Sequence, residues 1–219
     1  MRAFLAVLVA ASFLAGCGGS GEPATETTTT STAATLSECV SVEAPAPRDA
    51  GSSKAPSAPL DEAKTYALVF DTSCGSFTVT LDPRLAPKTS ASLVALARSG
   101  YFDDTIFHRV VPGFVIQGGD PTQSGSGGPG YSTVDVPPSD AAYTRGVVAM
   151  AKSGVEAPGT AGSQFFVVTG DDAGLPPEYA IVGKVTDGMD TVERIDALGV
   201  ADGPPSKPVV VTSVTVSES

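Results

Sequence analysis

The segment "FHRVVPGFVIQGGD", from Phe107 to Asp120, holds two short apolar runs that Pro112 and Gly113 separate. Inside the first run stands Arg109, whose guanidinium stays charged at physiological pH. His108, the only histidine among 219 residues, directly precedes it. Because a charge is costly to place among phenylalanines and valines, these two residues are the first candidates for a function.

Short runs of β-type residues lie on both sides of this segment. In "SFTVTLD" (76–82), apolar and polar residues alternate with the period of a half-buried strand. The preceding "SCG" predicts a hairpin turn at Gly75. Seven further runs have strand character, so we expect eight strands; these runs are "YALVFDT", "IFHRV", "FVIQG", "GVVAMA", "QFFVVT", "AIVGKV" and "PVVVTSVTV".

Two stretches have helical character instead. "APKTSASLVALARSG" (86–100) and "DGMDTVERIDALG" (187–199) place apolar residues three or four positions apart and end in glycine. The elements predict a mainly β domain over residues 65–219. A closed eight-stranded antiparallel β-barrel capped by two α-helices suits them, because closure removes exposed strand edges. Periodicity alone permits a sandwich equally well.

The first residues are typical of an export signal. A basic start, Met1 and Arg2, precedes the apolar run "AFLAVLVAASFLA" (3–15), which is shorter than the ~20 residues that a membrane-spanning helix needs. "LAGC" (14–17) resembles the lipobox of bacterial lipoproteins, which implies a signal peptide over residues 1–16 and lipidation of Cys17. The alternative is an ordinary secreted protein with a cysteine there by chance.

The segments between this signal and the domain differ in composition. Residues 17–35 are rich in Gly, Ser, Thr and Glu and predict a lipid anchor with a flexible tether, and residues 36–64 predict an extended N-terminal segment. With Cys17 assigned to lipid, Cys39 and Cys74 remain, and an oxidising compartment favours a disulfide between them. Such a bridge would contribute about 3–4 kcal/mol; two unrelated thiols are the alternative.

Several function classes are excluded. A net charge of −11 with 13 Lys and Arg argues against a nucleic-acid partner. One histidine rules out a two-histidine zinc site, there is no CxxC pair, and no serine lies in a nucleophile elbow. "GSGGPG" (125–130) matches a dinucleotide-binding pattern only formally, because it contains Pro129 and no helix pattern follows. We therefore expect no metal and no cofactor.

Three segments together indicate a family. "FHRVVPGFVIQGGD", "GVVAMAK" and "GSQFFVVT" resemble the hallmark blocks of the cyclophilins, the peptidyl-prolyl cis-trans isomerases. The resemblance extends through "YFDDTIFHRV", "GGPGY" and "YAIVGKVTDGMDTVERI" and covers nearly all of residues 65–215. It implies an eight-stranded antiparallel barrel capped by two helices.

The resemblance also implies roles for single residues. Arg109 takes the position of the catalytic arginine. His108 is expected to be structural, because neighbours along a strand point to opposite faces and His108 would then turn inward. For Phe165 and Phe166, simple core packing is the default, and the same alternation lets one pack inside while the other lines the pocket. The substrate-binding positions are Phe114, Val115, Gln117, Ala151, Lys152, Gln164, Phe166, Leu175 and Tyr179.

Three residues depart from the family pattern. Gly174 stands where many members carry an aromatic side chain, so one side of the pocket is expected to be open. Val115 replaces a residue that is often methionine, and Lys152 one that is often asparagine. The loop over residues 153–162 is a few residues longer than in short cytosolic members. These departures bear on substrate preference more than on the fold.

The chain is thus expected to be a peptidyl-prolyl isomerase that assists the folding of exported or envelope proteins. The alternative is a module with the same fold that binds or holds proline-containing peptides with little turnover. We expect a monomer, extracytoplasmic and lipid-anchored to a bacterial membrane, with proline-containing polypeptides as partners and membrane contact through the anchor only. A secreted form without lipid is the alternative location.

Overall fold

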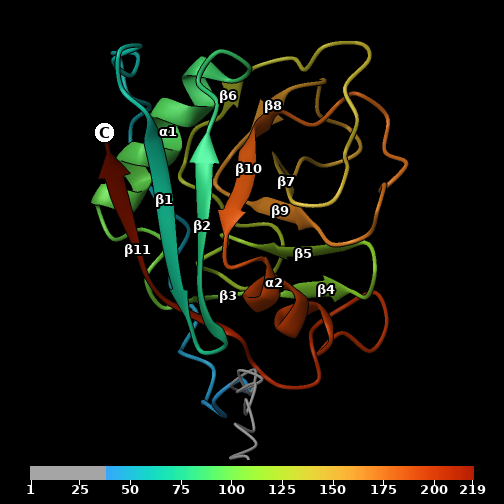
Figure 1. Cartoon of the computed structure of the whole chain (residues 1–219). Coiled ribbons are helices and arrows are strands. Elements are labelled where there is room, and N and C mark those ends of the chain that lie inside the picture. Colours follow the sequence, from blue (N-terminus) through green and yellow to red (C-terminus); the bar gives the residue numbers. More distant parts are fainter. Residues whose placement is uncertain (1–37) are drawn as a thin grey trace, which may run out of the picture. The chain divides into compact units, whose positions relative to one another are not determined.

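A computed structural model describes residues 38–219 of the chain, which form one antiparallel β structure with two helices (Figure 1). The elements, in chain order, are β1 (Tyr66–Thr72), β2 (Gly75–Leu81), α1 (Pro87–Arg98), β3 (Thr105–Ile106), β4 (Arg109–Val111), β5 (Val115–Gly118), β6 (Thr133–Val134), β7 (Val147–Met150), β8 (Thr160–Ala161), β9 (Phe165–Val168), β10 (Ile181–Asp187), α2 (Met189–Asp196) and β11 (Val210–Glu218).

Nine of the strands form one curled sheet in the order β3-β11-β1-β2-β10-β7-β9-β5-β4, and β6 pairs with β8 in a small second sheet. The long strands β1, β2 and β11 run crosswise to β4, β5 and β9 (Figure 1). An isolated bridge between Ile106 and Asp120 joins β3 to the residues that follow β5. The mainly β antiparallel fold with two helices is confirmed, while full closure of the barrel stays a prediction.

The strand prediction over residues 106–110 was wrong as a single element. The chain leaves β3, which pairs with β11, and enters β4, which pairs with β5, so the run divides between the two ends of the large sheet. Strands β6 and β8 were not predicted because two residues each are too short to show a period. The remaining strand runs and both helices are confirmed within a few residues of the expected ends.

An aromatic cluster fills the interior of the curled sheet. The rings of Phe70 and Phe77 stack at 4.8 Å between centroids, and Phe165 lies 5.1 Å from Phe70. Phe102 and Phe107 meet Phe165 edge-on at 6.2 and 6.1 Å. Because the chain has no tryptophan, the large aromatic side chains of this core are mainly these five phenylalanines.

The two helices pack on different parts of the sheet. Helix α1 begins at Pro87, which suits the first helical turn, and packs on β11 and β6. Helix α2 packs on β2, β4 and β5. Gly188 starts α2 with φ at 73°, and a Cβ there would overlap the carbonyl oxygen of Ser76, so only glycine fits this close approach. No helix of the described part has the length and apolarity required to span a membrane.

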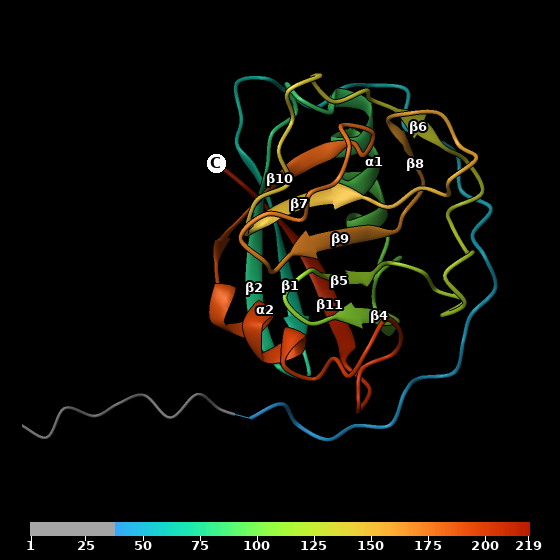
Figure 2. The same ribbon diagram turned by 90° about the vertical axis from the view of Figure 1, so that its right-hand side faces the viewer.

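Residues 38–64, here called the N-terminal strap, run over the domain surface without helix or strand (Figure 2). A disulfide joins Cys39 to Cys74 in the turn between β1 and β2. The backbone N–H of Val40 donates to Ser73 at 2.8 Å, and Lys207 Nζ donates to the carbonyl oxygen of Cys39 at 3.1 Å. The start of the strap is therefore fixed both covalently and by hydrogen bonds.

Further along, the strap contacts the loop that follows β5. The N–H of Arg48 donates to Pro121 at 2.8 Å, that of Gly51 to Gly128 at 2.9 Å, and that of Ser53 to Pro129 at 2.8 Å. The strap thus supports this loop from the outside. The predicted signal peptide, the tether and Cys17 lie outside the described residues.

Candidate functional site

Nine of the ten residues predicted for catalysis or substrate binding line one pocket of about 210 Å³. Strands β4, β5 and β9, which face the viewer in Figure 2, supply four of these residues, and the other five lie in the segments between strands. Gln164, the tenth residue, borders an adjoining hollow of about 640 Å³ together with Gln117, Ala151 and Lys152. The nine residues are Arg109, Phe114, Val115, Gln117, Ala151, Lys152, Phe166, Leu175 and Tyr179.

The strand register explains why these side chains meet. Arg109 in β4 pairs with Gln117 in β5, and Gln117 pairs with Phe166 in β9. Residues directly opposite each other in an antiparallel ladder share a face, so these three form a row across the pocket wall. Their neighbours Val110 and Phe165 are fully or almost fully buried in the core. The prediction that one of the two phenylalanines packs inside and the other lines the pocket is confirmed.

Arg109 has polar partners on two sides. Its Nε donates to Asp202 Oδ1 at 2.6 Å and its Nη2 to Asp202 Oδ2 at 3.1 Å. Its Nη1 donates to Gln117 Oε1 at 3.3 Å, and the Phe114 ring lies 5.9 Å from the guanidinium carbon. The hydrogen bonds from Arg109 lower the pKa of the Asp202 carboxyl. Asp202 was not predicted, because nothing in "VADGPPSK" indicates proximity to a residue 93 positions earlier.

A chain of hydrogen bonds continues from Arg109 across the groove. Gln117 Nε2 donates to Gln164 Oε1 at 3.1 Å, and Gln164 Nε2 donates to the carbonyl oxygen of Gly127 at 3.0 Å. The guanidinium can only donate and the carbonyl can only accept, so together they fix the orientation of both glutamine amides. Every hydrogen bond of this network is therefore donated in the same sense, from Arg109 through Gln117 and Gln164 to Gly127.

The apolar wall of the pocket is built from aromatic rings. Phe166 lies 5.6 Å from Tyr179 in an edge-on arrangement and 6.3 Å from Tyr143. The Tyr143 hydroxyl donates to the carbonyl oxygen of Tyr179 at 2.8 Å and accepts from its N–H at 2.9 Å, and burial raises its pKa. Tyr143 was missed in the sequence because a lone tyrosine outside any recognised motif gives no signal. Such a wall can hold a small ring such as that of proline.

Comparison with known proteins assigns the family. Residues 67–216 match the family model "Cyclophilin type peptidyl-prolyl cis-trans isomerase/CLD". This chain belongs to the cyclophilin family. Peptidyl-prolyl cis-trans isomerase-like 1 of Emericella nidulans is 42% identical over 132 residues, which cover 58% of this cyclophilin and 80% of the relative. Probable peptidyl-prolyl cis-trans isomerase A of Mycobacterium leprae is 39% identical over 166 residues, covering 67% and 89%.

Solved structures agree with this assignment. A Cryptosporidium parvum cyclophilin type peptidyl-prolyl cis-trans isomerase superposes with a TM-score of 0.64 at 32% identity, over 70% of this cyclophilin and 98% of that chain. The same protein, solved in the presence of the dipeptide Ala-Pro, gives a TM-score of 0.63. The strap lies outside the family match and is therefore a feature beyond the shared domain.

Lys152 is folded into the wall of this cyclophilin's groove. Its side chain is only 2% exposed, and its Nζ lies 3.0 Å from the Glu178 carboxylate and 5.4 Å from the centre of the Tyr179 ring. The ammonium also donates to the carbonyl oxygen of Glu156 at 3.2 Å. Lys152 therefore links the loop after β7 to the segment before β10, and Glu178 neutralises its charge.

The side of the pocket near Gly174 is open. A Cβ atom placed at Gly174 would meet nothing within 4 Å, and the residue has a positive φ of 61°. Leu175 beside it lines the pocket. The structure agrees here with the expectation that a missing aromatic side chain leaves an open edge.

His108 lies outside the pocket of this cyclophilin. Its ring is beside Gly125 in the loop after β5, and neither ring nitrogen has a hydrogen-bond partner among the described residues. Burial lowers the pKa of His108, although the Asp120 carboxylate opposes this effect. The expected inward orientation was wrong in detail: Phe107 occupies the core position, and His108 precedes β4 and lies against the loop.

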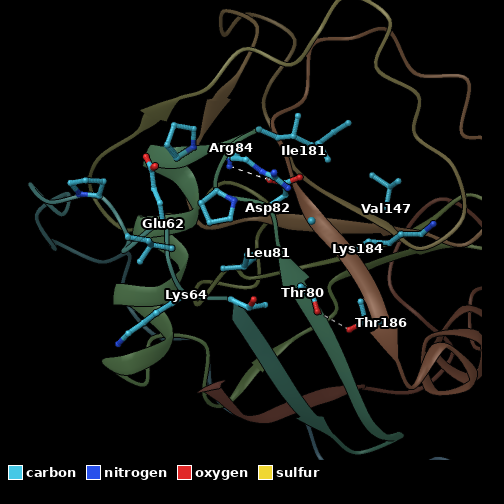
Figure 3. Close-up of a pocket in the computed structure, with 17 residues that line it drawn as sticks. Glu62, Lys64, Thr80, Leu81, Asp82, Arg84, Val147, Ile181, Lys184 and Thr186 are labelled. Carbon is cyan, nitrogen blue, oxygen red and sulfur yellow. Dashed lines mark hydrogen bonds and ion pairs between the residues drawn. The ribbon is translucent and has the colours of Figure 1, made fainter. Parts of the chain in front are cut away.

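A larger pocket, of about 1040 Å³, lies between β2, β10 and the end of the strap (Figure 3). It contains none of the predicted site residues. Arg84 contacts Asp82 at 3.4 Å, and the hydroxyls of Thr80 and Thr186 are 2.9 Å apart. Residues 38–219 hold no group of three or more side chains suited to a metal. The residues predicted for catalysis and substrate binding gather in the smaller pocket around Arg109.

Proposed function

We propose that this chain catalyses cis–trans isomerisation of Xaa-Pro bonds in exported or envelope proteins and so assists their folding. The family assignment supports the reaction, and the position of Arg109 in an aromatic pocket is the observation that carries it. The N-terminal sequence supports an extracytoplasmic location with a lipid anchor at a bacterial membrane, and we propose that the protein is a monomer there.

The reaction requires stabilisation of a twisted amide. Rotation about a peptide bond has a barrier of ~18–20 kcal/mol because the nitrogen lone pair is shared with the carbonyl. Before proline the two isomers differ by only ~0.5–1 kcal/mol, yet they exchange over tens to hundreds of seconds. In the twisted state the nitrogen regains its lone pair and can accept a hydrogen bond. A donor fixed beside that nitrogen therefore binds the transition state better than the planar amide.

Arg109 can supply this donor. Contacts with the described residues use three of its five N–H groups, which leaves two for a ligand in the pocket. A hydrogen bond from a charged group contributes ~1.5–3 kcal/mol, and each tenfold in rate requires about 1.4 kcal/mol. Arg109 thus accounts for one or two powers of ten. Phe166 and Tyr179 hold the proline ring while the preceding residue rotates.

A protease-coupled assay on a Xaa-Pro peptide tests the proposal. We expect Arg109→Ala to lower kcat/KM by about 10- to 100-fold, in line with the contribution of one charge-assisted hydrogen bond. Arg84→Ala is the matched control, because the Arg84 side chain is 91% exposed and lies in the other pocket. Equal rates for Arg109→Ala and the parent would contradict the assignment of the reaction to Arg109.

The open side at Gly174 and the small Val115 favour a second candidate, a module that binds proline-containing peptides with little turnover. In that case the parent and Arg109→Ala would both match the buffer rate while the parent still binds the peptide. The location is tested separately. The intact mass of the mature protein extracted from membranes distinguishes a lipidated Cys17 from a secreted form, and light scattering tests the monomer.

A further inference from the structure

The guanidinium of Arg109 binds the carboxylate of Asp202, a residue that the sequence did not predict to belong to the site. Asp202 lies in the loop over residues 199–207, which follows α2 and runs beside β4 (Figure 2). The carbonyl oxygen of Gly203, the next residue, accepts from the N–H of Val110 at 2.8 Å. This hydrogen bond fixes the loop to the strand that carries Arg109.

The contact uses one edge of the guanidinium. Arg109 Nε and Nη2 bind the two oxygens of Asp202 at 2.6 and 3.1 Å, whereas Nη1 lies on the other side and donates to Gln117. A guanidinium is planar and its five N–H groups have fixed directions. Two contacts along one edge therefore set both its position and its plane, which a single contact could not do.

We infer that Asp202 is a positioning residue for the isomerisation: by gripping the Nε–Nη2 edge of Arg109, it aims the remaining N–H groups into the proline pocket. This inference rests on the proposed function. Asp202 itself is 67% exposed and does not line the pocket, while the Arg109 side chain is 31% exposed and does. Asp202 therefore acts through Arg109 and does not touch the substrate.

The opposite effect, in which Asp202 blocks Arg109, does not fit the geometry. An inhibitory carboxylate would occupy the N–H groups that a substrate requires. Asp202 binds the edge away from Gln117, and Gln117 lines the pocket. On the pocket side, the chain from Gln117 through Gln164 to Gly127 completes the orientation. Removal of Asp202 should therefore disturb the alignment of the Arg109 guanidinium, and the N–H groups that it frees do not face the pocket.

Turnover of Asp202→Ala and Asp202→Asn tests the inference. We expect Asp202→Ala to lower kcat about three- to tenfold with KM unchanged, as for the loss of an exposed but bidentate ion pair. The kcat of Asp202→Asn should lie between those of the parent and Asp202→Ala, because the amide oxygen of asparagine still accepts one N–H of Arg109. Val200→Ala, in the same loop at a residue 71% exposed, and Asp140→Ala, at an exposed carboxylate elsewhere, should match the parent.

A second measurement needs no turnover. In a ¹H–¹⁵N spectrum, the Nε–H signal of Arg109, identified by its absence in Arg109→Lys, should exchange slowly in the parent and quickly in Asp202→Ala. If the parent is inactive, the proposed function fails and this signal still decides whether the contact exists. With an active parent, an Asp202→Ala protein that turns over as fast as the parent, or faster, overturns the inference. So does a slowly exchanging Nε–H in that variant.

Discussion

Loss of the disulfide between Cys39 and Cys74 should lower the stability of the domain strongly. The bridge closes a loop with a sequence separation of 35 residues. In the chain-entropy model, closing a loop of this length raises the free energy of the unfolded chain, and so the free energy of unfolding, by about 4 kcal/mol at 25 °C. With a urea m-value of about 2 kcal/mol/M, the unfolding midpoint should fall by roughly 2 M.

The assay is urea unfolding of the full chain with and without reductant, followed by circular dichroism. The double variant Cys39→Ala, Cys74→Ala should unfold at the midpoint of the reduced parent, and reductant should not change it further. This control separates the loss of the bridge from any other effect of the reductant. Equal midpoints for the oxidised and reduced parent, with mass spectrometry confirming both states, would refute the reasoning.

Two further predictions concern the loop after β5 and His108, which lies against it. Burial lowers the pKa of His108 from its ordinary value of 6.5, so below that pH the unfolded chain binds a proton that the folded protein does not. The free energy of unfolding of the parent should therefore decrease as the pH falls below 6.5. His108→Gln should lose less of it between about pH 7 and pH 5, and equal losses would contradict the role of burial. Gly127→Ala should lower both stability and kcat/KM, because its Cβ would overlap Asp120 Oδ1 and displace the carbonyl group that Gln164 binds. Gly128→Ala is the control: a Cβ there would have no atom within 4 Å, so this variant should resemble the parent. Similar unfolding midpoints and rates for the two alanine variants would show that the loop tolerates the shift.

Much of the fold is readable from local patterns. Alternation in "SFTVTLD" and the glycine in "SCG" are consequences of backbone geometry within a few residues, and the structure has β2 and its hairpin there. The division between β3 and β4 is different in kind. It depends on β11 and β5 being the respective neighbours, and pairing between segments far apart in sequence leaves no mark on "IFHRV" itself.

The site shows the same division. Arg109, Gln117 and Phe166 lie in motif segments, so the family resemblance was sufficient to bring them together, and the strand register explains why they meet. Asp202 and Tyr143 lie in segments without motif, and their roles arise from contacts across the fold. The burial of Lys152 was also beyond prediction, since a lysine in a loop is ordinarily solvated, and the contacts with Glu156, Glu178 and Tyr179 that favour its folded-in position arise from the fold.

The covalent link at the start of the strap has a mechanical consequence. Any pull on the chain before Glu38 would reach the domain first at Cys39, and the disulfide would pass the force into the β1–β2 hairpin, which β11 and β10 flank on either side. The part of the strap from Arg48 to Ser53, which supports the loop beside the groove, lies beyond that point and would remain slack. Force applied to the N-terminal side of Cys39 would thus leave the groove undistorted.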